Sequence, residues 1–239
     1  MNNPPYTFML KLDKVGMCYR RSRGIFGEKY WALKELSFKI RKGETLGIIG
    51  RNGVGKSTLL RLLAGIIKPD RGEIINFGNY SLALLSLQLG FMPHLTGREN
   101  AILSAMLMGV KRHEIEAKMD AIIDFSELGD FFDQPIATYS SGMSARLGFS
   151  VAFQVDPDIL LVDEVLGVGD EAFNRKSTQM MKEKIRTNKT IVLISHNANL
   201  LGELCDRIIW IEDGKVPVRG HPDKVLPRYH DFMRKAAKR

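Results

Sequence analysis

Cysteine is scarce in this sequence. Only Cys18 and Cys205 occur among its 239 residues, and they lie far apart in the chain. Zinc ribbons place their cysteines in closely spaced pairs, and small secreted proteins are stapled by several disulfides. Neither pattern is present, which argues against a zinc site or a disulfide framework and favours a reducing compartment.

Long apolar runs are also absent. The most apolar stretch, residues 81–95, is interrupted by Ser86, Gln88, Gly90 and Pro93. A membrane-spanning helix needs about 18 or more consecutive apolar residues. The N-terminus, MNNPPYTFML, lacks the basic segment and the long apolar stretch of a signal peptide. We therefore expect a chain that is soluble or that is attached to a membrane only through something else.

The composition is otherwise that of a globular protein. Hydrophobic residues make up 44% and charged residues 26%, and 239 residues suit one large domain or two small ones. The formal net charge of +8 is compatible with binding to nucleic acid, anionic lipid or an acidic partner, and equally with a solvated basic surface. Charge alone does not choose among these alternatives.

A glycine-rich loop lies within residues 44–64, which read ETLGIIGRNGVGKSTLLRLLA. The segment from Gly50 to Ser57 matches the pattern G-x-x-x-x-G-K-[ST], in which backbone N–H groups and a helix N-terminus surround phosphate oxygens. We expect Lys56 to bind the β- and γ-phosphates and Ser57 to ligate Mg²⁺. The predicted nucleotide-binding residues of this segment are Gly50, Asn52, Gly53, Gly55, Lys56, Ser57 and Thr58.

Strands and helices alternate around this loop. Residues 8–17 and 36–40 are predicted to be strands ahead of it, and a helix over 57–67 is followed by strands at 73–77 and 81–87. Further along, three segments have the apolar spacing of helices, with N-caps at Thr96 and Ser140. These helical segments are residues 97–108, 112–125 and 140–154.

Two later strands are apolar without alternation, at residues 159–162 and 190–194. Strands buried on both faces look like this, so a mostly parallel sheet covered by helices is predicted. The expected fold is α/β, a P-loop NTPase with that sheet as its core, an N-terminal antiparallel β part and an inserted helical subdomain. We expect one domain over 1–239, with 1–95 and 156–239 as the catalytic core and 96–155 as the helical subdomain.

Polar residues follow both of the later strands. Asp163 and Glu164 end the run ILLVDE, a Walker B pattern, and His196 follows the second strand. The carboxyl ends of parallel strands meet at one edge of a sheet, so these residues should lie near the glycine loop. We expect Asp163 to hold Mg²⁺ opposite Ser57, and Glu164 to deprotonate the attacking water. His196 is expected to donate a hydrogen bond near the γ-phosphate. Taken alone, acidic pairs often just end strands in solvent, and strand-end histidines are often structural.

The sequence favours adenine as the base. Guanine-binding proteins carry Asn-Lys-x-Asp, and residues 188–191 read NKTI without the aspartate. Aromatic side chains beside basic residues stack on bases. We expect Trp31 to pack in the core and Tyr19 to stack on adenine.

Residues 139–143, YSSGM, resemble the LSGGQ signature of ABC ATPases, and the resemblance extends over almost the entire chain. In that family each ATP is enclosed by the glycine loop of one subunit and the signature of another. The resemblance therefore implies a homodimer, with Ser140, Ser141 and Gly142 contacting the γ-phosphate held by a partner copy. It also implies that Asp170 is the D-loop aspartate and that His196 is the switch histidine.

A narrower resemblance is carried by YWALKELSF, LGFMPHLTGREN, YSSGMSARLGFSVAF and LLVDEVLGVGDEAF. These stretches are similar to the ATPase subunits of bacterial exporters of O-antigen, capsule or teichoic acid. Val165–Asp170 is its clearest mark, because many ABC ATPases have Pro-Thr-Ser-Ala-Leu-Asp there. The resemblance implies a separate integral-membrane permease that handles the polymer, a peripheral position on the cytoplasmic face of the bacterial inner membrane, and no direct contact with nucleic acid.

The family's Q-loop glutamine contacts Mg²⁺ and senses the permease. This role is assigned to Gln88, one residue from the aligned position, which Leu87 occupies. Some O-antigen exporters extend into a carbohydrate-binding β-domain, which we do not expect here after Arg239. Two alternatives stay open: an ABC ATPase for another cargo, such as a lipid or drug, and a soluble ABC-type ATPase acting on nucleic acid or ribosomes. The +8 charge encourages the second, whereas the lack of a coiled-coil insertion or a second cassette argues against it.

Overall fold

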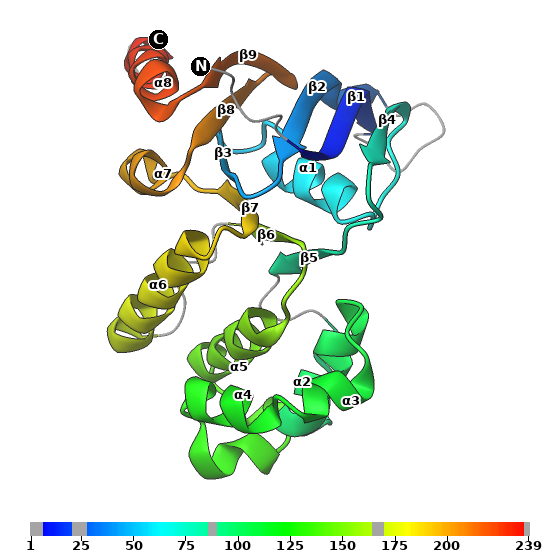
Figure 1. Ribbon diagram of the computed structural model, residues 1–239, viewed down its shortest axis with the longest axis vertical. Helices are drawn as coiled ribbons and strands as arrows, with labels where there is room; N and C mark the ends of the chain where they lie inside the picture. The colour runs from blue at the N-terminus through cyan, green and yellow to red at the C-terminus, as the bar shows by residue number, and fades with distance from the viewer. Residues whose placement is uncertain (1–6, 21–27, 86–89, 164–169, 237–239) are drawn as a thin grey trace. The chain divides into compact units, whose positions relative to one another are not determined.

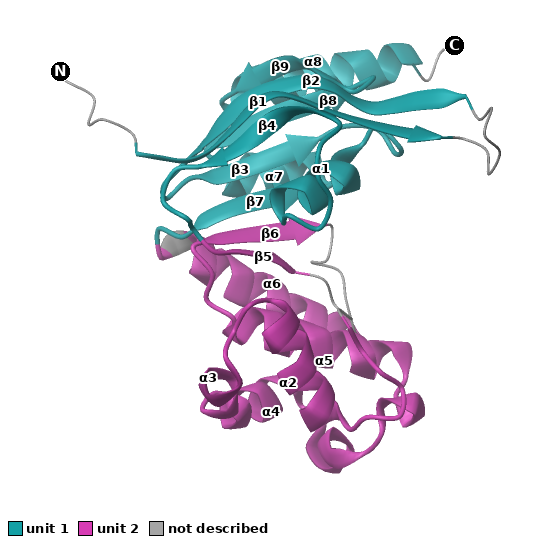
Figure 2. Cartoon of the chain, turned by 90° about the vertical axis from the view of Figure 1, so that its right-hand side faces the viewer, with its two compact units in different colours: residues 1–80, 188–239 teal, residues 81–187 magenta. Residues whose placement is uncertain are grey.

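The computed structural model describes residues 7–20, 28–85, 90–163 and 170–236 (Figure 1). The chain forms two compact units, residues 1–80 with 188–239 and residues 81–187 (Figure 2). We call them unit 1 and unit 2. No helix among the described residues is long and apolar enough to cross a membrane.

Unit 1 contains a three-stranded antiparallel sheet in the order β2-β1-β4. Its strands are β1 (Phe8–Arg20), β2 (Lys29–Arg41) and β4 (Arg71–Asn76). Leu12 of β1 lies opposite Phe38 of β2 on one side and Ile74 of β4 on the other. This is the expected N-terminal antiparallel part of the fold.

Strands β1 and β2 are longer than predicted. The first strand was predicted to end at residue 17, but Tyr19 is part of β1 and pairs with Tyr30 of β2. Both strands extend beyond their apolar runs, because backbone hydrogen bonds continue the ladder where the side chains are exposed.

The second sheet of unit 1 has the strand order β7-β3-β8-β9. Its strands are β3 (Thr45–Ile49), β7 (Thr190–Ile194), β8 (Arg207–Glu212) and β9 (Lys215–Gly220). β3 pairs in parallel with β7 and β8, and every residue of β3 and β7 is buried. The unbroken apolar sequences of these two strands are explained by this burial on both faces.

Strands β8 and β9 were not predicted. They form an antiparallel hairpin whose turn residues, Asp213 and Gly214, both have positive φ, at 48° and 72°. Asp-Gly between two strands is a strong hairpin signal, since such a turn needs left-handed backbone at both central residues. The signal was therefore present in the sequence.

The described part of unit 1 has three helices: α1 (Lys56–Leu63), α7 (Ala198–Leu204) and α8 (Pro222–Ala236). α1 is shorter than the predicted 57–67, because the chain turns at Gly65, which has φ of +71°. α8 buries Val225 and Tyr229 and packs against β8 and β9. Its last turn carries Arg234, whose side chain is exposed.

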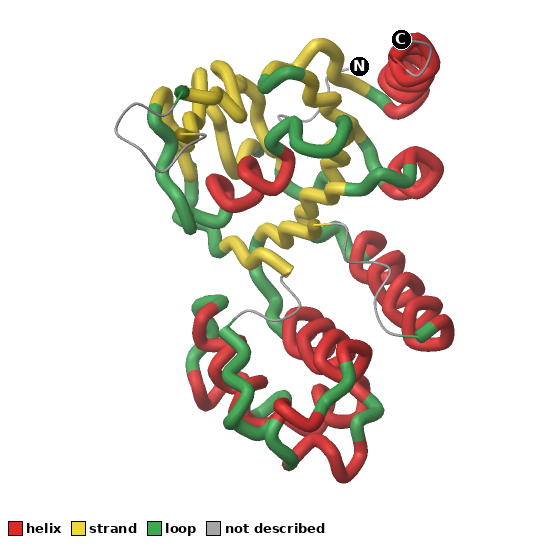
Figure 3. The backbone as a smooth tube through the Cα atoms, turned by 180° about the vertical axis from the view of Figure 1, so that it is seen from behind, coloured by secondary structure: helices red, strands yellow, loops and turns green. Residues whose placement is uncertain are grey.

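Unit 2 pairs two parallel strands, β5 (Leu82–Leu85) and β6 (Ile159–Asp163), and carries helices that are red in Figure 3. The α-helices are α2 (Gly97–Leu107), α3 (Arg112–Glu116), α4 (Met119–Ser126), α5 (Ser141–Gln154) and α6 (Glu171–Arg186). Two 3₁₀ turns, η1 (Gly129–Asp133) and η2 (Ile136–Thr138), lie between α4 and α5.

The prediction of one helix over 112–125 was wrong. The chain breaks between α3 and α4, where the Nζ of Lys118 donates to the carbonyl oxygen of Gln154 at 2.8 Å. Ile115 in α3 and Ile122 in α4 both belong to the buried core of this unit. The helical spacing of apolar residues therefore continues across the break, which is why one helix was predicted.

Both predicted N-caps of unit 2 are confirmed. The Thr96 hydroxyl accepts from the backbone N–H of Glu99, whose carboxylate accepts from the N–H of Thr96 in return, which forms a capping box. The Ser140 hydroxyl accepts from the N–H of Met143 at 3.1 Å. α5 therefore begins directly after Ser140.

Candidate nucleotide-binding site

The glycine loop of unit 1 connects β3 to α1 and lies close to neighbouring backbone. A Cβ atom on Gly50 would lie 2.3 Å from the carbonyl oxygen of Ile211 in β8. A Cβ atom on Gly55, which has φ of +100°, would lie 2.7 Å from the carbonyl oxygen of Ala32 in β2. Glycine is therefore required at both ends of the loop, by contact at Gly50 and by contact and conformation at Gly55.

Lys56 places its charge inside this loop. The side chain is only 7% exposed, and its Nζ donates to the carbonyl oxygens of Gly50 and Arg51 at 2.8 and 2.9 Å. α1 begins at the same residue and has no acidic residue in its first turn. A positive side chain and the positive end of a helix dipole thus coincide, and this combination attracts anions such as phosphate.

Arg51, the second residue of the glycine loop, is paired with the buried carboxylate of Glu212. The Nε of Arg51 donates to Oε1 of Glu212 at 2.8 Å, and Glu212 is 9% exposed. The hydrogen bond and the charge of Glu212 raise the pKa of Arg51 above its ordinary value. The guanidinium carbon also lies 5.5 Å from the ring centroid of Phe232 in α8. This pair was not predicted, because its two residues are far apart in the chain.

Two tyrosines lie beside the loop. The Tyr19 hydroxyl is 3.5 Å from Oγ1 of Thr58, and the Tyr30 hydroxyl donates to the carbonyl oxygen of Gly53 at 3.3 Å. Both side chains are more than a third exposed, at 38% and 39%. Trp31 is half-buried rather than in the core, and the guanidinium carbon of Arg71 lies 4.3 Å from its ring centroid.

His196 follows the carboxyl end of β7, the strand beside β3. Its side chain is exposed, and the next residue, Asn197, caps α7 by accepting from the N–H of Leu200 at 3.1 Å. Ile48 of β3 pairs with Ile194 of β7. The histidine and the glycine loop therefore both follow the carboxyl ends of adjacent parallel strands.

The signature segment of unit 2 borders a cavity of about 450 Å³. Ser140 and Gly142 at the start of α5 line it together with Arg146 and Asp170. The Asp170 carboxylate caps α6 by accepting from the N–H of Phe173 at 2.9 Å, and it also accepts from Arg146. Two of the predicted groups, the signature and Asp170, are thus brought together.

The charge on Asp170 is stabilised locally. The N–H of Phe173 and then the guanidinium of Arg146 lower the pKa of Asp170 below its ordinary value. Arg146 also donates to Glu127 at 3.2 Å. Arg146 was not predicted as a site residue, although it lies four residues after Gly142 and so on the same face of α5.

The predicted site residues are distributed over both units. Asp163 is the half-buried last residue of β6 in unit 2. Gln88 and Glu164 lie outside the described residues. Unit 1 holds Tyr19, Gly50, Asn52, Gly53, Gly55, Lys56, Ser57, Thr58 and His196, whereas unit 2 holds Ser140, Ser141, Gly142, Asp163 and Asp170.

A glycine-rich loop between a buried parallel strand and a helix, in an α/β fold, defines a P-loop NTPase. Within that class, residues 33–167 match the family model for ABC transporters. The chain is 48% identical over 207 residues to the O-antigen export system ATP-binding protein RfbB of Klebsiella pneumoniae, covering 87% of this chain and 84% of that protein. It is 46% identical over 204 residues to the teichoic acids export ATP-binding protein TagH of Lactococcus lactis, covering 85% of this chain and 43% of that protein. The chain belongs to the ABC transporter family, and it is an ATPase.

Solved structures share this fold. A dimeric ATP-binding cassette in a post-hydrolysis state, bound to ADP and Pi, superimposes with a TM-score of 0.73 at 25% identity, covering 90% of this chain and 99% of that one. An ATP-binding subunit of an ABC transporter gives a TM-score of 0.76 at 22% identity, covering 93% of each chain. The predicted α/β fold with a parallel core is confirmed.

Proposed function

We propose that this chain is the ATP-hydrolysing subunit of a transporter that exports a lipid-linked polysaccharide across the bacterial inner membrane. The observation that carries the proposal is the identity of 48% over most of both chains to an O-antigen export ATP-binding protein. A teichoic acids export protein at 46% identity supports the same class of cargo. The chain would lie on the cytoplasmic face of the membrane, bound to a separate permease.

Unit 1 supplies the groups that would bind the nucleotide. Lys56 would exchange its hydrogen bonds to loop carbonyls for phosphate oxygens, and the N–H groups at the start of α1 would donate to the same anion. Tyr19 would stack on adenine, because its ring is exposed next to Thr58.

The residues predicted to bind Mg²⁺ fit that ion. The Ser57 hydroxyl is exposed in the first turn of α1, and Asp163 ends β6 as a half-buried carboxylate. Hydroxyl and carboxylate oxygens are ligands that Mg²⁺ accepts, and Gln88 would add an amide oxygen. Bound Mg²⁺ neutralises charge on the β- and γ-phosphates.

The hydrolytic step would fall to Glu164 and His196. Glu164 would accept a proton from the attacking water, and His196 would donate a hydrogen bond where charge develops on the γ-phosphate. Ser140, Ser141 and Gly142 would contact the ATP of a second copy, because the chain has one glycine loop and one signature. Their position at the start of a helix suits that contact.

Exposed apolar residues of unit 2 support the proposal that the chain binds a permease. Met92, Met106 and Leu107 are 44%, 48% and 56% exposed. Gly90 lies against Leu107, since a Cβ atom there would be 2.2 Å from Leu107 Cδ1. Exposed large apolar side chains are typical of protein contacts. We propose that these residues contact the permease. Met106 and Leu107 would belong to the helical subdomain of residues 96–155 in a single ATPase domain, and Met92 lies just before it.

A cellular experiment tests the function. The gene is deleted together with its neighbouring permease gene, and polymer is measured at the surface and in the cytoplasm. Loss of surface polymer with accumulation inside is expected, and complementation with the wild-type pair should restore export, whereas complementation with a Lys56→Ala pair should not. Unchanged surface glycan would contradict the proposal.

A further inference from the structure

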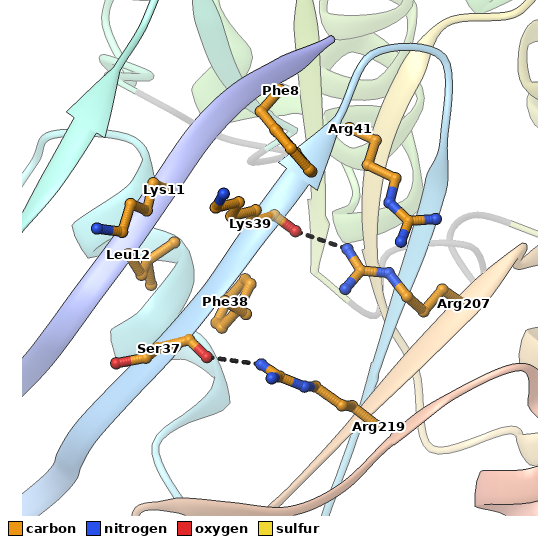
Figure 4. Close-up of a pocket in the computed structure, with 9 residues that line it drawn as sticks. All are labelled: Phe8, Lys11, Leu12, Ser37, Phe38, Lys39, Arg41, Arg207 and Arg219. Carbon is orange, nitrogen blue, oxygen red and sulfur yellow. Dashed lines mark hydrogen bonds between the residues drawn. The ribbon is translucent and has the colours of Figure 1, made fainter. Parts of the chain in front are cut away.

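A basic cavity of about 370 Å³ lies in unit 1, away from the glycine loop (Figure 4). Residues of β1, β2, β8 and β9 line it. Among the described residues that line it, five side chains are cationic and none is acidic. The cationic residues are Lys11, Lys39, Arg41, Arg207 and Arg219.

Nearby carboxylates compensate only part of this charge. Asp13 accepts from Lys11 at 2.7 Å, and the buried Glu44 accepts from Arg207 at 2.7 Å. Lys39 and Arg219 make no ion pair within the described part of the chain. Since like charges repel across a confined space, a cavity with these uncompensated cations attracts an anion.

Backbone carbonyls hold the arginines of β8 and β9 in place. Arg207 donates to the carbonyl oxygen of Lys39 at 2.6 Å, and Arg219 donates to that of Ser37 at 2.8 Å, as Figure 4 shows. A carbonyl is neutral, so these bonds orient the guanidinium groups without cancelling their charge. A fixed guanidinium loses little conformational freedom when its remaining N–H groups bind a phosphate.

The cavity also has an apolar side. Leu12 and Phe38 line it and are buried, and the Nζ of Lys39 lies 4.3 Å from the ring centroid of Phe8. Apolar walls lower the local dielectric and strengthen the attraction between fixed cations and an anion. They also suit the organic part of a phosphate ester.

The cavity is distinct from the nucleotide site. Arg207 pairs with Leu46 near the amino end of β3, whereas the glycine loop follows Ile49 at its carboxyl end. The rise of a strand, about 3.3 Å per residue, puts these two positions on the order of 10 Å apart along the sheet. Lys56 is hydrogen-bonded to Gly50 and Arg51 beyond the carboxyl end of β3, whereas Arg207 is hydrogen-bonded to Lys39 and Glu44 at the amino end, so the two side chains mark separate positions for a phosphate.

We propose that this cavity is a second phosphate-binding site, whose ligand is a phosphate group of a membrane lipid or of a small soluble molecule. The ordinary reading of a basic cavity is a solvated surface on a chain with a net charge of +8. The two arginines held by carbonyls and the absence of acidic lining favour a site. This proposal does not depend on the cargo of the transporter.

The test uses the full chain saturated with ADP, so that the glycine loop is occupied. One arm titrates inorganic pyrophosphate by calorimetry, and the other sediments the protein with phosphatidylcholine vesicles with and without phosphatidylglycerol, both at 150 mM salt. The cavity variant is Lys39→Gln with Arg219→Gln, which leaves the buried Glu44–Arg207 pair intact. The matched control is Arg112→Gln with Arg175→Gln, which removes the same charge from exposed positions of unit 2.

We expect the cavity variant to bind at least tenfold more weakly and the control to stay within about twofold of wild type, as expected for the loss of two charge-assisted contacts. Loss in the pyrophosphate arm identifies a soluble ligand, and loss only in the vesicle arm identifies a lipid headgroup. Equal effects in both variants, or no binding of either probe by the wild type, would overturn the proposal. If the double variant does not fold, the variant Arg219→Lys replaces it, because lysine keeps the positive charge but lacks the planar guanidinium. Unchanged binding of both probes by Arg219→Lys would then overturn the proposal.

Discussion

The Nζ of Lys56 lies 2.8 Å from the carbonyl oxygen of Gly50, the first glycine of the loop that it closes. Together with a second bond to Arg51, this contact keeps a buried ammonium group at the centre of the loop. The lysine is thereby oriented before a nucleotide arrives, which reduces the entropy that binding must overcome.

Lys56→Ala should weaken ATP binding about 10- to 100-fold, because a hydrogen bond to a charged group contributes about 1.5–3 kcal/mol. Titration with a fluorescent ATP analogue measures the affinity. Lys68→Ala, an exposed lysine just beyond α1, is the matched control and should bind as the wild type does. Equal affinity of the Lys56 variant and the control would remove Lys56 from the phosphate site.

Tyr19→Ala should lower ATP affinity about tenfold, since stacking of a base on an aromatic ring is worth about 1–3 kcal/mol. Affinity for tripolyphosphate should not change, because that ligand has no base. Tyr30→Ala is the control, as its side chain is equally exposed and pairs across the strands with Tyr19. A larger loss in the Tyr30 variant would transfer the stacking role to Tyr30.

Glu164→Gln should bind ATP normally and hydrolyse it about 10²- to 10⁴-fold more slowly, the usual contribution of a general base. Because ATP then persists, the variant should accumulate as a dimer, which light scattering in the presence of ATP would detect. Glu171→Gln, an exposed acid at the start of α6, serves as the control. Full hydrolysis by the Glu164 variant would exclude it as the base.

Asp170→Asn should lower the melting temperature in a pH-dependent way. The pKa of Asp170 is lowered in the folded chain, so its carboxylate stabilises the fold above its ordinary pKa of about 3.9, and this contribution is lost as pH falls through the lowered value. The difference in melting temperature from wild type should be full at neutral pH and shrink as the pH falls below about 4.

Asp130→Asn is a suitable comparison for that experiment, since Asp130 is an exposed acid of the same unit. A difference between wild type and Asp170→Asn that stays constant down to acid pH would show that the charge of Asp170 does not stabilise the fold.

The parts of the structure that were predicted correctly have local causes. The strand–loop–helix from Thr45 to Leu63 follows from an apolar run, a glycine spacing and a leucine pattern that adjoin one another. The caps at Thr96 and Ser140 likewise depend on residues within three positions. The nucleotide-binding class could be predicted for the same reason.

Apart from the β8–β9 hairpin, whose Asp-Gly turn is a local signal, the parts that were missed depend on distant residues. The lengths of β1 and β2 are set by their pairing with each other, and the break between α3 and α4 coincides with a contact from Lys118 to α5. Arg51 donates a hydrogen bond to Glu212, which lies 161 residues further along the chain. No local pattern encodes such partners, so tertiary contacts overrode the propensities.

The strand that carries the glycine loop has its neighbours at the far end of the chain. Thr45 of β3 pairs with Ile191 on one side, and Leu46 pairs with Arg207 on the other. Contacts of such long sequence separation form slowly, since the intervening chain must first be ordered. During synthesis, the ribosome must therefore translate β8 before β3 can pair with both of its neighbouring strands. An emerging chain can form its ATP-binding loop only near the end of translation of this domain.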